Sequence, residues 1–245
     1  MKDNFSIQSD NYAKYRPAYP TEFYDYLYSL IPASHVAWDC GTGNGQVAFE
    51  LAKKFDHVFA SDLSESQIKN ALQSKNIVYS IQAAEQTFFE KDQFDLIIVA
   101  QAIHWFDFDK FYSEVRRTGN SNAILCVLGY GKIEISEEMD RVINYFYRNV
   151  IGSYWDKERK YIDENYKTIP FPFQEYTAPD FVNKIQWSLD HLIGYLNTWS
   201  AVKHFISKNN YNPLDALMKE IEILWGDSEE REVRFPLLLR IGKIH

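Results

Sequence analysis

The feature that most constrains this chain is a run of three glycines at alternate positions, Gly41, Gly43 and Gly45. A short apolar segment with Asp39 near its end precedes them, and apolar side chains at helical spacing follow them. Glycine is favoured where the backbone takes a positive φ or must approach a ligand closely. The first turn of a helix also leaves N–H groups unpaired. We therefore predict a strand–turn–helix unit that holds the polar part of a ligand.

The segments that follow repeat the alternation of strand and helix. Strands are expected at 35–39, 57–62, 76–81, 94–100 and 123–128, with helices between them. This alternation is typical of βαβ units in a parallel sheet. After Gly131 we expect helices at 136–150, 190–205 and 213–225, and strands at 180–188 and 231–244. The pattern predicts a doubly wound α/β core with a mainly helical cap.

No repeat or low-complexity linker interrupts the 245 residues, which favours one domain. We assign residues 1–29 to an N-terminal arm, about 30–131 and 229–245 to the core, and about 132–228 to the cap. Pro20 and Pro32 bracket a helix that we expect to begin with Thr21 as its N-cap.

Charge and composition exclude several classes of protein. The formal net charge is −8, and an acidic chain lacks the basic face that nucleic-acid binding requires. The apolar run 96–100 is too short for a membrane span, and residues 1–10 lack the apolar segment of a signal peptide. Cys40 and Cys126 have no metal-ligand spacing. We expect two buried thiols, no metal site and a cytoplasmic protein.

Two acids indicate which ligand the glycine turn holds. Asp62, at the end of the second strand, suits the ribose hydroxyls of NAD or of S-adenosylmethionine. The dinucleotide-binding pattern Gly-x-Gly-x-x-Gly requires a glycine at the position that Gln46 occupies. Asp39 would repel a diphosphate and suits the ammonium and sulfonium groups of S-adenosylmethionine. This favours S-adenosylmethionine, while an NAD-linked oxidoreductase and a non-enzymatic S-adenosylmethionine-binding protein stay open.

Several motifs, taken in order, resemble the class I S-adenosylmethionine-dependent methyltransferases. They are Asp39-x-Gly41-x-Gly43-x-Gly45, Asp62, Ala84-Glu85 and Gln101-Ala102-Ile103-His104-Trp105-Phe106. The segments Tyr12-x-x-Tyr15-Arg16-Pro17-x-Tyr19-Pro20 and Gly194-Tyr195-Leu196-x-Thr198-Trp199-Ser200 are similar to the type 11, small-molecule branch that includes trans-aconitate methyltransferases. The resemblance implies a Rossmann-like, doubly wound, seven-stranded sheet whose last strand is antiparallel.

The resemblance also implies a set of residues that bind S-adenosyl-L-methionine. Asp62 would bind the ribose, Leu63 the adenine face, Ala84 and Glu85 the adenine edge, and Gln101 the methionine amino end. The whole set is Tyr15, Arg16, Asp39, Gly41, Thr42, Gly43, Gly45, Asp62, Leu63, Ala84, Glu85 and Gln101.

Methyl transfer requires alignment and exclusion of water more than strong acid or base chemistry. His104, just past the fourth strand, is a candidate base or hydrogen-bond donor, and Arg16 is a candidate partner for a carboxylate. The candidate substrate-binding residues are Tyr19, His104, Trp105 and Trp199, with Tyr154 as a further cap residue. We expect a small-molecule acceptor, with O-methylation of a carboxylate as the leading chemistry. Its identity, the methylated atom and the choice between monomer and homodimer stay open.

Overall fold

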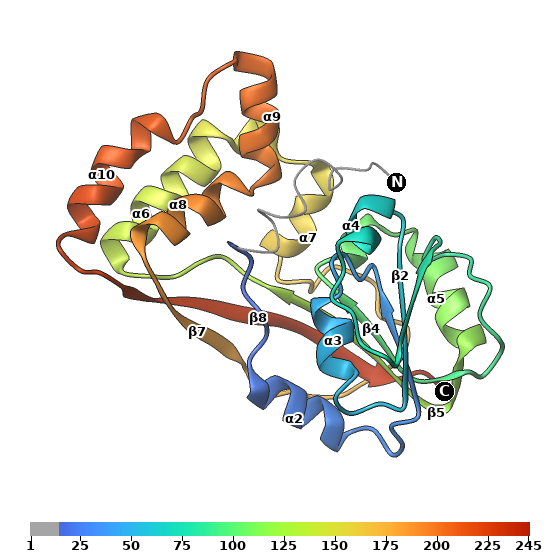
Figure 1. Cartoon of the computed structure of the whole chain (residues 1–245). Coiled ribbons are helices and arrows are strands. Elements are labelled where there is room, and N and C mark those ends of the chain that lie inside the picture. Colours follow the sequence, from blue (N-terminus) through green and yellow to red (C-terminus); the bar gives the residue numbers. More distant parts are fainter. Residues whose placement is uncertain (1–14) are drawn as a thin grey trace.

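The computed structural model describes residues 15–245, so that Tyr12 of the arm motif lies outside the described residues. Five parallel strands form the centre of the sheet: β1 (Val36–Cys40), β2 (His57–Asp62), β3 (Ile77–Ile81), β4 (Phe94–Ala100) and β5 (Gly119–Tyr130). β8 (Arg231–Lys243) pairs antiparallel with β5, and the two-residue β6 (Gln174–Glu175) pairs with β8. The order β3-β2-β1-β4-β5-β8-β6 confirms the predicted Rossmann-like sheet with an antiparallel last strand (Figure 1).

Four helices flank this sheet: α2 (Thr21–Ser29), α3 (Gln46–Leu51), α4 (Glu65–Lys69) and α5 (Phe108–Thr118). β4 is buried along almost its whole length because helices cover both faces of a parallel sheet. The Ser64 hydroxyl accepts a hydrogen bond from the Gln67 N–H and caps α4. The predicted N-cap Thr21 is wrong, since Pro20 takes the extended N-cap conformation and Thr21 is already helical.

The cap consists of α6 (Glu137–Tyr145), α7 (Lys160–Asp163), β7 (Val182–Trp187), α8 (Leu189–Asn197), α9 (Ser200–Asn209) and α10 (Asp215–Trp225). A π-helical turn, Phe146–Val150, extends α6. The single helix expected at 190–205 is wrong, because the Thr198 hydroxyl donates to the Tyr195 carbonyl and Trp199 is extended. Two helices therefore stand where the periodicity indicated one.

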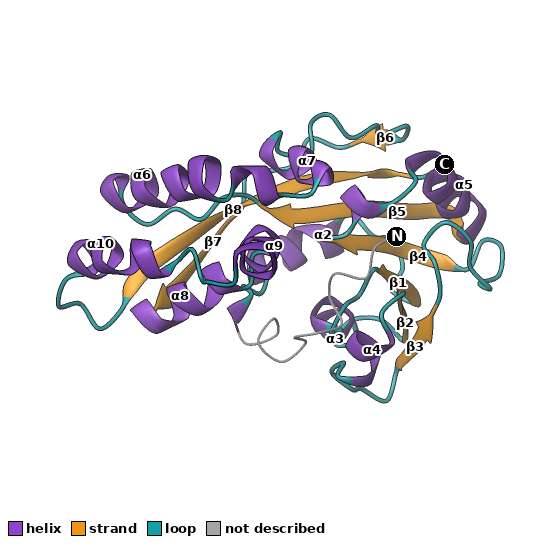
Figure 2. Ribbon diagram, turned by 90° about the horizontal axis from the view of Figure 1, so that it is seen from above, coloured by secondary structure: helices purple, strands orange, loops and turns teal. Residues whose placement is uncertain are grey.

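β8 joins the two parts of the molecule. Its first half, Arg231 to Pro236, pairs with β7, and its second half, Leu237 to Lys243, pairs with β5. Figures 1 and 2 show β8 running from the sheet to the region where α6, α8 and α10 gather. Pro236 lies where the pairing partner changes. The prediction placed 229–245 in the core, whereas Val233 and Phe235 are buried among cap residues.

The two thiols occupy strands of the core. Cys40 in β1 and Cys126 in β5 are both buried, as expected. Along residues 15–245 no helix combines the length and the apolar character that crossing a bilayer needs.

Candidate active site

The glycine turn after β1 takes the conformation that its sequence predicts. Gly41, Gly43 and Gly45 have φ values of +72°, +54° and +78°. The Gly41 and Thr42 N–H groups both donate to the Ser61 carbonyl, which ties the turn to β2. A Cβ atom on Gly41 would lie 2.6 Å from the Ala102 Cβ, so glycine also lets the loop after β4 pack against the turn.

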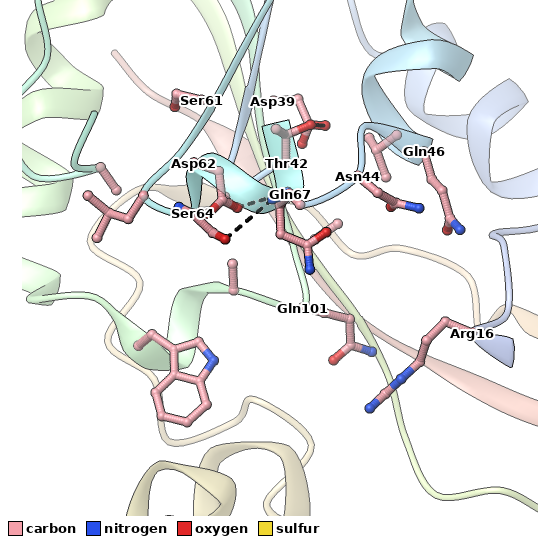
Figure 3. Close-up of a pocket in the computed structure, with 18 of the residues that line it drawn as sticks. Arg16, Asp39, Thr42, Asn44, Gln46, Ser61, Asp62, Ser64, Gln67 and Gln101 are labelled. Carbon is pink, nitrogen blue, oxygen red and sulfur yellow. Dashed lines mark hydrogen bonds between the residues drawn. The ribbon is translucent and has the colours of Figure 1, made fainter. Parts of the chain in front are cut away.

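A cavity with about 1200 Å³ of empty space opens at the carboxyl ends of the parallel strands, and we name it the larger cavity. Ligands of open α/β sheets bind at this edge. The predicted residues that line it are Arg16, Tyr19, Asp39, Gly41, Thr42, Gly43, Asp62, Leu63, Ala84, Gln101 and Trp105. Figure 3 shows the acids on the glycine-turn side, with Arg16 and Gln101 across from them.

Asp39 gives the larger cavity a specific preference for a cation. Its Oδ2 accepts hydrogen bonds from the Thr42 hydroxyl (2.5 Å) and the Ala48 N–H (2.9 Å). Its Oδ1 is buried and has no hydrogen-bond partner among residues 15–245. Burial, with a smaller contribution from the nearby Asp62 carboxylate, raises the pKa of Asp39 to about 7. A buried acceptor that lacks a donor is what the ammonium group of a methionyl ligand would complete.

Asp62 lies on the same side of the larger cavity as Asp39 and organises the glycine turn (Figure 3). Its Oδ2 accepts from the Gly43 N–H (2.9 Å), and its Oδ1 accepts from the Ser64 N–H (2.8 Å). Asp62 also lines the larger cavity, where a carboxylate can accept from ligand hydroxyls. Asp62 therefore fixes the glycine turn and the start of α4 while it faces the larger cavity.

Gln101 and Arg16 lie where the larger cavity continues toward the cap. Gln101 has a φ of +56°, a costly conformation for a residue other than glycine, and its N–H donates to the Leu128 carbonyl. Arg16 Nη1 donates to the Tyr130 hydroxyl at 2.7 Å, and its guanidinium lies 5.5 Å from the Tyr195 ring centre. These contacts attach the N-terminal arm to both the core and the cap.

Three predicted cofactor residues do not line the larger cavity. Tyr15 packs against α8, where a Cβ on Gly194 would lie 2.4 Å from its ring. Gly45 packs under Tyr79, whose hydroxyl would be 2.2 Å from an added Cβ. The Glu85 carboxylate accepts from the backbone N–H at the start of α5. The structure gives these residues supporting contacts around the site.

A second cavity, with about 660 Å³ of empty space, adjoins the first, and we name it the smaller cavity. The two share Arg16, Gln101 and Trp105. The other residues that line the smaller cavity are His104, Trp155, Asp156, Arg159, Ile162, Thr198, Trp199, Ser200 and Lys203. His104 and Trp199 both line the smaller cavity, whereas Tyr154 does not. The charged side chains of this cavity are three cations, Arg16, Arg159 and Lys203, and one acid, Asp156.

His104 is a buried neutral side chain. Its Nδ1 lies 3.5 Å from the Tyr166 hydroxyl. Burial, with a smaller contribution from the Arg159 charge, lowers the pKa of His104 to about 3. A group this weakly basic makes a poor general base at neutral pH, so the geometry favours the hydrogen-bonding role of His104.

Sequence reasoning missed several residues of both cavities. Gln67 and Gln82 are buried polar side chains that line the larger cavity. Trp155, Arg159 and Lys203 line the smaller one. The polar and aromatic composition of residues 154–166 is the sequence signal for this segment, but composition does not predict which side chains point into a cavity.

Comparison with known proteins agrees with this geometry. A family model described as a methyltransferase domain matches residues 38–127. A Dictyostelium discoideum protein described as a methyltransferase is 33% identical over 249 residues, which cover 98% of this chain and 95% of that protein. The solved structure of a type II methyltransferase from Anaeromyxobacter dehalogenans is 36% identical, with a TM-score of 0.87 over 94% of this chain and 98% of that one. A methyltransferase structure from Bacillus halodurans shares only the fold, at 18% identity and a TM-score of 0.53 over 92% and 99% of the two chains.

Proposed function

The chain belongs to the class I S-adenosylmethionine-dependent methyltransferases, and we propose that it methylates a small organic acid on a carboxylate oxygen. The observation that carries the proposal is the smaller cavity, where Arg16, Arg159 and Lys203 meet a single acid, Asp156. Cations that line the cavity next to the proposed cofactor cavity favour an anionic acceptor.

The larger cavity fits the cofactor of this family, S-adenosyl-L-methionine. Asp39 Oδ1 would accept from its ammonium group, and Asp62 would accept from its ribose hydroxyls. When bound, it supplies a methyl group on a sulfonium sulfur and leaves as the neutral thioether S-adenosylhomocysteine. Asp39 and Asp62 both face the larger cavity and would repel a diphosphate, so no observation favours the NAD-linked alternative.

A carboxylate acceptor also fits the weak basicity of His104. A carboxylic acid with an ordinary pKa is ionised at neutral pH and needs no proton removed before it reacts. Arg16 and the neutral His104, which line the smaller cavity, would orient the acceptor oxygen by hydrogen bonds. The Trp105 and Trp199 side chains would exclude water from it.

The test is formation of S-adenosylhomocysteine from a panel of mono- and dicarboxylic acids, phenols and amines at neutral pH. We expect turnover with at least one acid and recovery of its methyl ester. Turnover confined to amines or phenols would contradict the proposal. Cofactor binding without turnover on any compound would favour the non-enzymatic alternative.

The pH dependence provides a separate prediction. At saturating S-adenosylmethionine, kcat/KM for the acid should show no inflection near pH 6.5, the ordinary pKa of histidine, because His104 stays neutral there. It should fall only near about pH 4, where the acceptor itself becomes protonated. His104→Gln keeps an N–H donor and should retain activity within about tenfold. An inflection near neutral pH that disappears in His104→Gln would instead identify a base.

A further inference from the structure

Arg159 has a fixed position although no carboxylate of the described residues pairs with it. Its guanidinium lies 4.6 Å from the Trp155 ring centre and 5.4 Å from the Tyr147 ring centre. Its Nε donates to the Tyr147 hydroxyl at 2.7 Å. Within residues 15–245 it forms no ion pair, and its two Nη groups make no other hydrogen bond to the protein. The side chain is half-buried, so its position is set by stacking and one hydrogen bond.

Tyr147 connects Arg159 to a negative charge indirectly. The Tyr147 hydroxyl accepts from Arg159 and donates to Asp163 Oδ1 at 2.7 Å. Tyr147 is buried, and its backbone carbonyl accepts from the Trp155 indole N–H at 3.2 Å. Asp163 therefore polarises the tyrosine without occupying the guanidinium. The arrangement leaves the Nη fork, which matches the two oxygens of a carboxylate, available to a ligand.

Arg159 does not border the larger cavity, where the cofactor would bind. Arg16, Gln101 and Trp105 border both cavities, whereas Arg159 lines only the smaller cavity and a third hollow beyond it. Lys203 lines the smaller cavity as well and forms no ion pair within the described residues. Asp156, the acid of this cavity, lies 4.0 Å from His204. Arg159 and Lys203 thus both line the smaller cavity from the cap.

We infer that Arg159, with Lys203, is the anchoring site for an acid group of the acceptor, and that Tyr147 is the positioning residue that presents the guanidinium. The inference rests on the proposed function for the identity of its ligand as the acceptor. The anchored group is distinct from the methylated atom, which lies at the Arg16 side. Loss of Arg159 therefore weakens acceptor binding equally in the ground state and the transition state, so that KM rises and kcat stays unchanged.

The experiment uses calorimetric titration of the full chain, saturated with S-adenosylhomocysteine, with benzoate and with its neutral isostere benzamide. Benzoate should bind in the millimolar range, and benzamide at least about tenfold more weakly. Arg159→Met and Arg159→Lys should both weaken benzoate about tenfold or more, because lysine lacks the planar fork. Tyr147→Phe keeps the ring and should weaken benzoate about threefold to tenfold.

Two control variants match these changes. Lys157→Met removes an exposed cation from the same segment, and Tyr154→Phe removes another cap hydroxyl; neither residue lines the smaller cavity. Both should leave benzoate affinity unchanged, and no variant should alter S-adenosylhomocysteine affinity.

Three results would overturn the inference: equal binding of benzoate and benzamide, no benzoate binding to the wild type, or unchanged benzoate affinity in Arg159→Met. Once an acid substrate is found, an Arg159→Met effect on kcat without an effect on KM would also overturn it. Benzoate binding at Arg159 in an enzyme that turns over no acid would refute only the proposed function.

Discussion

Replacement of Asp39 by asparagine is expected to weaken S-adenosylhomocysteine binding by more than about a hundredfold while the free protein becomes no less stable. Removing one member of a buried charge pair typically costs about 3–5 kcal/mol, and the ligand ammonium would lose its counter-charge in this variant. Asparagine can still accept from the Thr42 hydroxyl and the Ala48 N–H through its single carbonyl oxygen. The local structure of the turn should therefore survive.

The stability of the free protein should move in the opposite direction. Burial raises the pKa of Asp39 from 3.8 to about 7, so that the folded state holds this proton more tightly than the unfolded state does. Below about pH 4 the Asp39 carboxyl is protonated and does not lower the free energy of unfolding. As the pH rises from about 4 to about 7, its ionisation lowers the free energy of unfolding by a growing amount. A rise of about three pKa units corresponds to a loss of at most about 4 kcal/mol in the free energy of unfolding. Asparagine does not ionise, so the stability of Asp39→Asn relative to the wild type should increase as the pH rises.

Calorimetry with S-adenosylhomocysteine and urea unfolding near pH 4 and pH 8 measure the two effects. Asp95→Asn is the matched control, since Asp95 is a buried acid of β4 that accepts from the His35 and Val36 N–H groups outside both cavities. It should lose stability and keep its ligand affinity. Wild-type affinity for the ligand in Asp39→Asn would refute the role of this carboxylate.

The core and its ligand-binding edge were predictable because both depend on short-range patterns. The apolar run 94–100 matches β4 residue for residue. Parallel strands end at one edge of a sheet, so acids placed at the ends of two strands, Asp39 and Asp62, must meet there. The sequence alone is enough to bring these residues together, since no detail of packing can separate them.

Glycines illustrate what such patterns leave undetermined. Gly43 lines the larger cavity, whereas Gly45, two residues later, is required by the Tyr79 ring from β3. Both have positive φ, and both fit the same motif. Only the tertiary structure distinguishes a glycine that makes room for a ligand from one that makes room for a neighbouring side chain.

The smaller cavity could not be predicted, since irregular segments supply most of its lining. Arg159 belongs to a short 3-10 turn, Lys157–Arg159, and Trp199 lies in the break between α8 and α9. Lys203 lies on α9, whose direction depends on that break. Side chains from turns have no periodicity that fixes their direction, so acceptor specificity is the property least accessible from this sequence.

Gly41→Ala is expected to destabilise the protein by about 2–5 kcal/mol. The substitution has two costs: a left-handed φ of +72° for a residue with a Cβ, about 1–2 kcal/mol, and overlap with the Ala102 Cβ at 2.6 Å, about 1–3 kcal/mol. Gly43→Ala is the control for the first cost, because its φ is +54° and the nearest atom to its Cβ would be 3.9 Å away. It should cost only about 1–2 kcal/mol. Urea unfolding of the ligand-free variants measures both.

The double variant Gly41→Ala, Ala102→Gly separates the overlap from the backbone strain. Removing the Ala102 methyl group should recover the overlap cost and bring the loss of stability close to that of Gly43→Ala plus the loss for Ala102→Gly alone. Ala102 belongs to the loop that carries Gln101 and His104, which line the smaller cavity. Displacement of this loop in Gly41→Ala should therefore also weaken acceptor binding. If Ala102→Gly recovers no stability, the contact between turn and loop is not what requires glycine at position 41.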